Sequence, residues 1–177
     1  MLLNNSGYHF ITIELLILIC VLWVISFLST LIHELGHAAG YMLSTGGRRW
    51  HIRVGSGKKL FETKSLTVKL LILDGYFDPT EERIDTKAKL ISTLLGGPAA
   101  SLILVTALLL LRSAGVSFES DILASGTVEF FTNYALFYNA FILITSVIPA
   151  HYFWGEIRGM ETDGLKILIA LKNRDNR

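Results

Sequence analysis

The chain contains a single cysteine, Cys20, among 177 residues. An internal disulfide is therefore impossible, and no cluster of thiolates can hold a structural zinc ion. Cys20 also lies 13 positions before His33, the first histidine of the motif described below, which is about 20 Å along a helix. We interpret Cys20 as a small apolar packing residue and not as a metal ligand.

Basic residues are scarce over much of the chain. Of the 16 Lys and Arg residues, ten lie within residues 48–89, five follow Pro149, and Arg112 is the remaining one. Basic residues are retained on the cytoplasmic side of a membrane. We therefore expect the loop 44–90 and the C-terminus to be cytoplasmic, and the N-terminus and the loop 112–126 to be outside. Because acidic residues are interspersed among the basic ones, we expect no nucleic-acid partner.

Apolar residues, in contrast, are abundant. Hydrophobic residues make up 51% of the chain and the mean hydropathy is +0.50, which is too apolar for an ordinary soluble domain. Three stretches are long enough to span a bilayer, at about 10–32, 91–111 and 127–148. No basic segment precedes the first stretch, so we do not expect a removable signal peptide. We predict an α-helical polytopic membrane protein, a single domain over residues 1–177, embedded in the lipid bilayer of a bacterial or archaeal cell.

Between the first two spans the pattern of apolar residues changes to a period of two. Trp50, Ile52 and Val54 alternate with polar residues, a turn is indicated at 55–58, and a second strand-like segment follows at 66–73. This predicts a small β-hairpin region at the membrane surface. The exposed edges of such strands can pair with the main chain of an extended peptide.

The segment His33-Glu34-Leu35-Gly36-His37 closes the first apolar stretch. Residues four apart share one face of a helix, so both imidazoles can bind one metal ion while Glu34 accepts a proton from metal-bound water. Such side chains are costly at membrane depth unless something pairs with them. We therefore predict a Zn²⁺ site with Glu34 as general base. If the apolar part of the span begins at Leu15, His33 lies about 27 Å further along the helix, near the cytoplasmic face.

Catalytic zinc usually has three protein ligands, so a third must come from elsewhere in the chain. The residues that follow the third span are expected at the same depth, and they include Glu156, Glu161 and Asp163. We favour Asp163, because Asp-Gly opens a short apolar helix at 164–171 and a helix N-terminus favours an ionised carboxylate. Glu156 and Glu161 remain alternatives.

Three features resemble, in their order along the chain, the site-2 protease family of intramembrane zinc metalloproteases. They are the HELGH at 33–37, the GGPAAS at 96–101 that opens the next span, and Ile148-Pro149 followed by Thr162-Asp163-Gly164. The resemblance implies a three-helix catalytic core in which His33, His37 and Asp163 hold zinc. It also implies that Glu34 acts as general base and acid, and that the site faces the cytoplasm. The length leaves no room for an accessory domain of the PDZ type, so we expect a minimal core.

The chain departs from the family pattern in two places. Ser146 stands where the family commonly has Asn, and the interval between Pro149 and Asp163 is longer than usual. Ser146, Pro149 and His151 are candidates for positioning the substrate.

We therefore expect a zinc-dependent endopeptidase that hydrolyses a peptide bond in a membrane-embedded or membrane-proximal substrate, with zinc-activated water and Glu34 as general base. One alternative is a membrane zincin whose third ligand is Glu156 or Glu161. A second is a membrane protein that binds transmembrane helices without cleaving them. The sequence identifies neither an oligomeric state nor a regulatory membrane partner.

Overall fold

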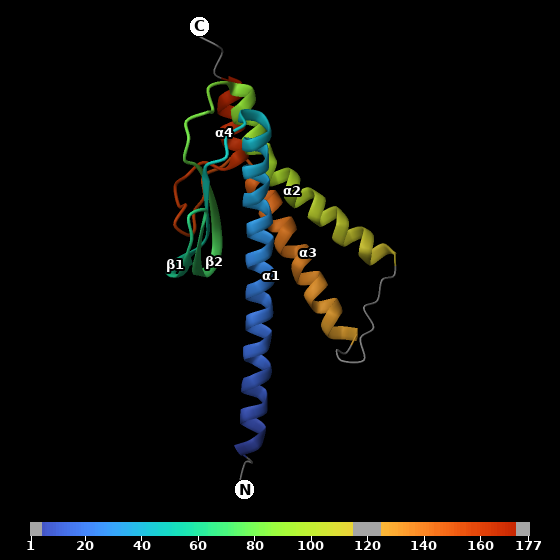
Figure 1. The fold of residues 1–177 in the computed structure, drawn as a ribbon. Helices are drawn as coiled ribbons and strands as arrows, with labels where there is room; N and C mark the ends of the chain where they lie inside the picture. Colours follow the sequence, from blue (N-terminus) through green and yellow to red (C-terminus); the bar gives the residue numbers. More distant parts are fainter. Residues whose placement is uncertain (1–4, 115–124, 173–177) are drawn as a thin grey trace.

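A computed structural model describes the backbone of residues 5–114 and 125–172 and the side chains of residues 13–114 and 127–172. It contains four helices and a two-stranded antiparallel hairpin between the first two helices. Helix α1 runs the length of the molecule, the hairpin lies along one side of its C-terminal half, and α2 and α3 diverge on the other side (Figure 1). The elements are α1 (Asn5–Thr45), β1 (Trp50–Glu62), β2 (Leu66–Pro79), α2 (Lys87–Ser113), α3 (Ser125–Val147) and α4 (Asp163–Lys172).

Three of these helices are long and apolar enough to cross a membrane. The candidate spans are Ile13–Thr45, Lys87–Ser113 and Thr127–Val147, which confirms the three predicted stretches. Large apolar side chains face outward from them, as at Ile103 (69% exposed) and Phe137 (70% exposed). Contact of such apolar surfaces with lipid is more favourable than contact with water. The expected outer loop 112–126 lies mostly outside the described residues.

Helices α1 and α2 approach each other closely where their glycines meet. A Cβ atom on Gly36 would overlap the carbonyl oxygen of Gly96, and a Cβ on Gly96 would overlap that of Gly36. Small residues allow membrane helices to pack backbone against backbone. This close packing brings the α1 motif against the GGPAAS segment of α2.

The hairpin is more folded than the sequence indicated. Ile52 pairs with both Phe77 and Leu66, so the ribbon doubles back on itself. The bend falls at Gly55 and Gly57, whose φ angles of 88° and 79° favour glycine. The chain therefore reverses at the predicted turn 55–58, because residues 50–54 and 59–62 run in opposite directions along residues 66–68, and it reverses again at 63–65.

Strand β2 runs along α1 toward the HELGH motif. The indole Nε1 of Trp23 donates to the carbonyl of Leu70 at 2.7 Å, and further along β2 Gly75 lies against Thr30 and Glu34. The buried side chains of Ile52 and Val54 pack with Ala38 of α1, which fixes the ribbon in this position. The hairpin thus forms one wall of the region around Glu34.

Candidate metal centre

Helix α1 presents two histidines to one point. His33 and His37 are each 5% exposed, and their Nε2 atoms are 3.2 Å apart. The spacing of four residues places both rings on the same face, as the motif predicted. Glu34 lies beside them and is 6% exposed.

Asp163, the first residue of α4, reaches the same point from the C-terminal part of the chain. Its Oδ2 atom lies 3.3 Å from Nε2 of His37 and 3.7 Å from Nε2 of His33. The three ligand atoms lie within 4.8 Å of one another and all three residues are buried. The structure therefore brings the predicted third ligand to the histidine pair, and the group can hold a metal ion.

The hydrogen bonds around the histidines suit metal binding. His37 Nδ1 lies 2.9 Å from the carbonyl oxygen of Thr93, and His33 Nδ1 lies 2.8 Å from the hydroxyl of Ser101. A carbonyl oxygen only accepts, so a proton on His37 Nδ1 would satisfy it and would leave Nε2 free as a ligand. Two imidazole nitrogens and one carboxylate oxygen form a donor set that catalytic zinc accepts.

Asp163 is held in its ionised form. Burial by itself would raise the pKa of this carboxyl, but the neighbouring side chains of His33 and His37 outweigh burial and hold the pKa well below its usual range. Ser146 Oγ also donates to Asp163 Oδ2 at 2.6 Å. The predicted site residue Ser146 is therefore present at the centre, where it contacts the carboxylate.

Two glycines let backbone segments close over the group. A Cβ on Gly97 of α2 would overlap Nε2 of both His33 and His37, and a Cβ on Gly75 of β2 would overlap Glu34 Oε1. Neither role was predicted, although Gly97 lies in the GGPAAS segment that carries the resemblance.

Two small cavities flank the centre, and His33 and Glu34 line both of them. The cavity on the side of α4, lined also by Phe77, Met160 and Lys166, has a volume of about 80 Å³. The cavity on the side of α3, lined also by Leu73, Tyr138 and Trp154, has a volume of about 60 Å³. We call them the α4-side and α3-side cavities.

Tyr152 lines both cavities and was missed as a functional residue. Burial raises the pKa of its phenol, and the charges of Asp163 and Glu34 raise it further, so the hydroxyl stays protonated. A protonated phenol beside the centre can donate a hydrogen bond to a ligand in either cavity. Its place in the long interval after Pro149 gave no hint of this position.

The remaining predicted residues lie further from the three ligands. Pro149 and His151 are exposed, and neither is among the residues that line the two cavities, so their role in positioning a substrate stays a prediction. Glu161 lines the α4-side cavity without joining the ligand group. Glu156 binds Lys69 and Arg53 instead.

Comparisons with known proteins found no match for this chain among protein-family models, curated proteins or solved structures. The resemblance to site-2 proteases therefore rests on the residues themselves and stays a prediction.

Replacing Asp163 tests the ligand set. The Asp163→Asn variant should lose more than about 100-fold in zinc affinity, because loss of a mere hydrogen-bond partner of a ligand already costs about 10- to 100-fold. The Glu161→Gln and Glu156→Gln variants are matched controls and should keep their metal. The measurement is zinc titration with a competing chelator. If Glu161→Gln releases the metal and Asp163→Asn does not, the ligand set is wrong.

Proposed function

We propose that this protein is a zinc-dependent intramembrane endopeptidase of the site-2 protease type. The observation that carries the proposal is that buried His33, His37 and Asp163 meet beside Glu34. The two histidines and Glu34 lie on α1, which is long enough to cross a membrane. Polar groups at such a depth are costly and usually functional. The order of motifs along the chain supports the same class.

The residues have distinct roles in this proposal. His33, His37 and Asp163 hold the zinc ion. A bound zinc ion would supply a Lewis acid that polarises a carbonyl oxygen and lowers the pKa of water. Glu34 accepts a proton from the attacking water, whose oxygen bonds to the peptide carbonyl carbon. Glu34 then returns that proton to the amine nitrogen as the C–N bond breaks.

The substrate would be a transmembrane or membrane-attached peptide that enters in an extended form. A helix hides its carbonyls in its own hydrogen bonds, so the segment must unwind before it can be cut. Gly75, Tyr76 and Phe77 of β2 line the α4-side cavity, so the main chain of an unwound peptide would lie beside that strand. Pairing with β2 would hold it there.

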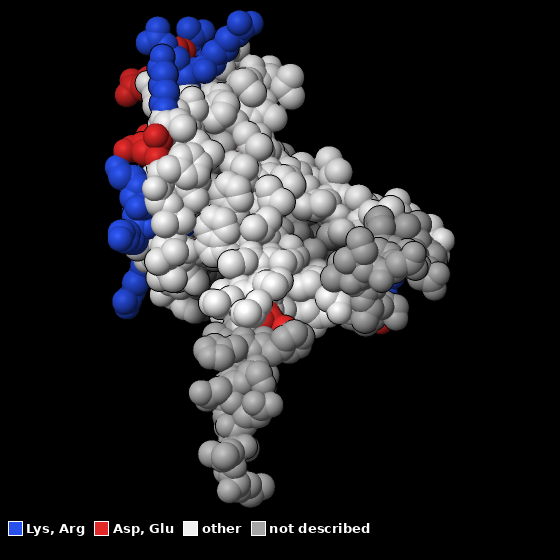
Figure 2. Space-filling view, turned by 60° about the horizontal axis from the view of Figure 1, so that its bottom comes forward, with Lys and Arg blue, Asp and Glu red and all other residues white. Residues whose placement is uncertain are grey.

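The distribution of charge supports a cytoplasmic position for the hairpin and α4. Lys and Arg gather along the hairpin side and at the α4 end of the molecule, and most of the remaining visible surface is uncharged (Figure 2). By the positive-inside rule the N-terminus would be outside, and cleavage would occur near the cytoplasmic boundary of a bacterial or archaeal cell membrane.

The Glu34→Gln variant separates chemistry from metal binding. The amide keeps the size of the side chain but cannot accept a proton, so cleavage should fall by about 10²- to 10⁴-fold while zinc content is unchanged. The assay is cleavage of a single-span peptide in reconstituted vesicles, alongside metal analysis. Undiminished turnover in the variant would mean that Glu34 is structural.

Reporter fusions test the orientation. A fusion at Gly57 and one at the C-terminus should report from the cytoplasm, and one at Ser117 should report from outside, because 15 of the 16 basic residues lie on the first side. Alkaline phosphatase and green fluorescent protein are suitable reporters. Phosphatase activity from the Gly57 fusion would invert the proposed topology.

A further inference from the structure

The segment between α3 and α4 is pinned at both ends. We call residues 150–162 the strap. Thr162 Oγ1 donates to the carbonyl of Ile148 at 2.7 Å, and Thr162 N donates to the carbonyl of Ala150 at 3.0 Å. His151 and Glu161 also form a β-bridge across the base. The two ends of the strap are thus fastened to each other immediately before Asp163.

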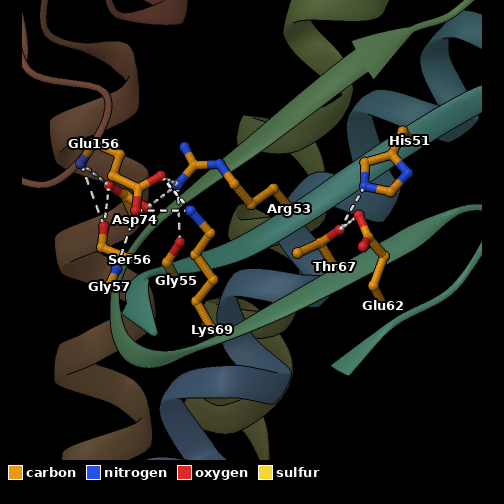
Figure 3. A network of polar contacts seen from close by, with 10 residues as sticks. All are labelled: His51, Arg53, Gly55, Ser56, Gly57, Glu62, Thr67, Lys69, Asp74 and Glu156. Atoms are coloured by element: carbon orange, nitrogen blue, oxygen red, sulfur yellow. Dashed lines mark hydrogen bonds and ion pairs between the residues drawn. The ribbon is translucent and has the colours of Figure 1, made fainter. Parts of the chain in front are cut away.

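The tip of the strap is fastened separately, to the hairpin (Figure 3). The carboxylate of Glu156 lies 2.5 and 2.7 Å from Lys69 Nζ and 3.0 Å from Arg53 Nη1, and it accepts a hydrogen bond from Gly57 N at 3.0 Å. These contacts hold the pKa of Glu156 below its usual range. The hydrogen bond from Lys69 has the largest effect, and the hydrogen bond from the backbone of Gly57 has the next largest. The backbone N–H of Glu156 donates to Asp74 Oδ2 at 2.7 Å.

Asp74 is the fixed half of this contact. Its side chain is fully buried, and it accepts hydrogen bonds from Ser56 Oγ at 2.7 Å and from Arg53 Nη1 at 3.2 Å. Gly155 has a φ of 66° and a Cβ there would overlap Asp74 Oδ2, so a glycine lets the strap backbone reach the carboxylate. Asp74 and Glu156 balance the charges of Arg53 and Lys69, so the cluster is neutral.

The strap covers the candidate metal centre. Ile157, which is 5% exposed, and Tyr152 line both cavities, so the strap forms part of the wall of each of them. With volumes of about 80 and 60 Å³, the cavities are far smaller than the roughly 300–1,000 Å³ of ordinary ligand pockets. An extended peptide therefore requires some covering element to move.

The strap is the covering element that can move with least loss of contacts. The hairpin is held by its ladder and by packing on α1, whereas the polar contacts that hold the tip of the strap converge on Glu156, whose side chain is 40% exposed. Ion pairs that are this open to solvent are weak. The base contacts at Thr162 are independent of the tip, so the tip can release without displacing Asp163.

We propose that the strap is a gate over the metal centre and that the Glu156 contacts with Lys69, Arg53, Gly57 and Asp74 are its latch. Release of the latch joins the two cavities and admits the peptide, while the base of the strap keeps Asp163 in place. The identity of the entering molecule rests on the proposed function. The latch itself does not.

The test compares Glu156→Gln with Glu62→Gln in the full-length protein in detergent. Glu62 is a matched control because it pairs with Lys59 on the same hairpin, away from the strap. Hydrogen–deuterium exchange of residues 150–162 should quicken about tenfold in Glu156→Gln and stay unchanged in Glu62→Gln. The Lys69→Glu and Glu156→Lys double variant reverses one ion pair and should recover part of the protection.

Metal release gives a second readout. Zinc content should be the same in both single variants, but a chelator should remove zinc about tenfold faster from Glu156→Gln, because the gate limits access. Unchanged exchange in the strap would overturn the latch, and so would loss of zinc at equilibrium, because Asp163 would then depend on the tip. A protein that binds no zinc and cleaves no peptide would contradict the proposed function, and the exchange measurement would still decide the latch.

Discussion

Two imidazole nitrogens and a carboxylate oxygen meet in a buried place between helices that are long enough to cross a membrane. Burying such groups is costly unless each has a partner. The partners come from the two other long helices. Helix α2 contributes the Thr93 carbonyl and the Ser101 hydroxyl to the histidines, and α3 contributes Ser146 to Asp163. The glycines at which α1 and α2 meet make these short contacts possible.

The polar face of α1 continues beyond the centre. Ser26 lies 2.7 Å from the hydroxyl of Tyr134, and Ser29 accepts a hydrogen bond from Asn139 at 2.8 Å. Hydrogen bonds between membrane helices contribute about 0.6 kcal/mol each on average, so these contacts orient α3 more than they stabilise it. One face of α1 therefore both aligns α3 and carries the two histidines, and Ser146 reaches Asp163 as a result.

Much of this arrangement was predictable because it depends on local spacing. Apolar length predicted the spans, the interval of four residues predicted the shared face of His33 and His37, and the Asp-Gly at a helix start favoured Asp163. The turn at 55–58 was predicted from its glycines, but the pairing of Ile52 with both Leu66 and Phe77 was not, because no local pattern joins residues that far apart in the chain.

The strap was not predictable for a similar reason. Glu156 meets Lys69 and Arg53, which are 87 and 103 positions earlier in the chain, and no local pattern joins them. Its aromatic residues 152–154 lie in the interval that is longer than the family pattern, and nothing else in the sequence marks them. In the folded protein Tyr152 lines both cavities beside Glu34, and Trp154 lines the α3-side cavity. Charge pairs between residues this far apart in the chain can be identified only from the folded structure.

The central claim is that His33, His37 and Asp163 share one zinc ion. X-ray absorption at the zinc edge of the purified, zinc-loaded protein tests it most directly. The account predicts one zinc per chain with only nitrogen and oxygen neighbours at about 2.0–2.2 Å. Scattering from two imidazole rings should be present and should fall to one ring in the His37→Ala variant. A sulfur neighbour, an unchanged spectrum in that variant, or no bound zinc at all would contradict the account.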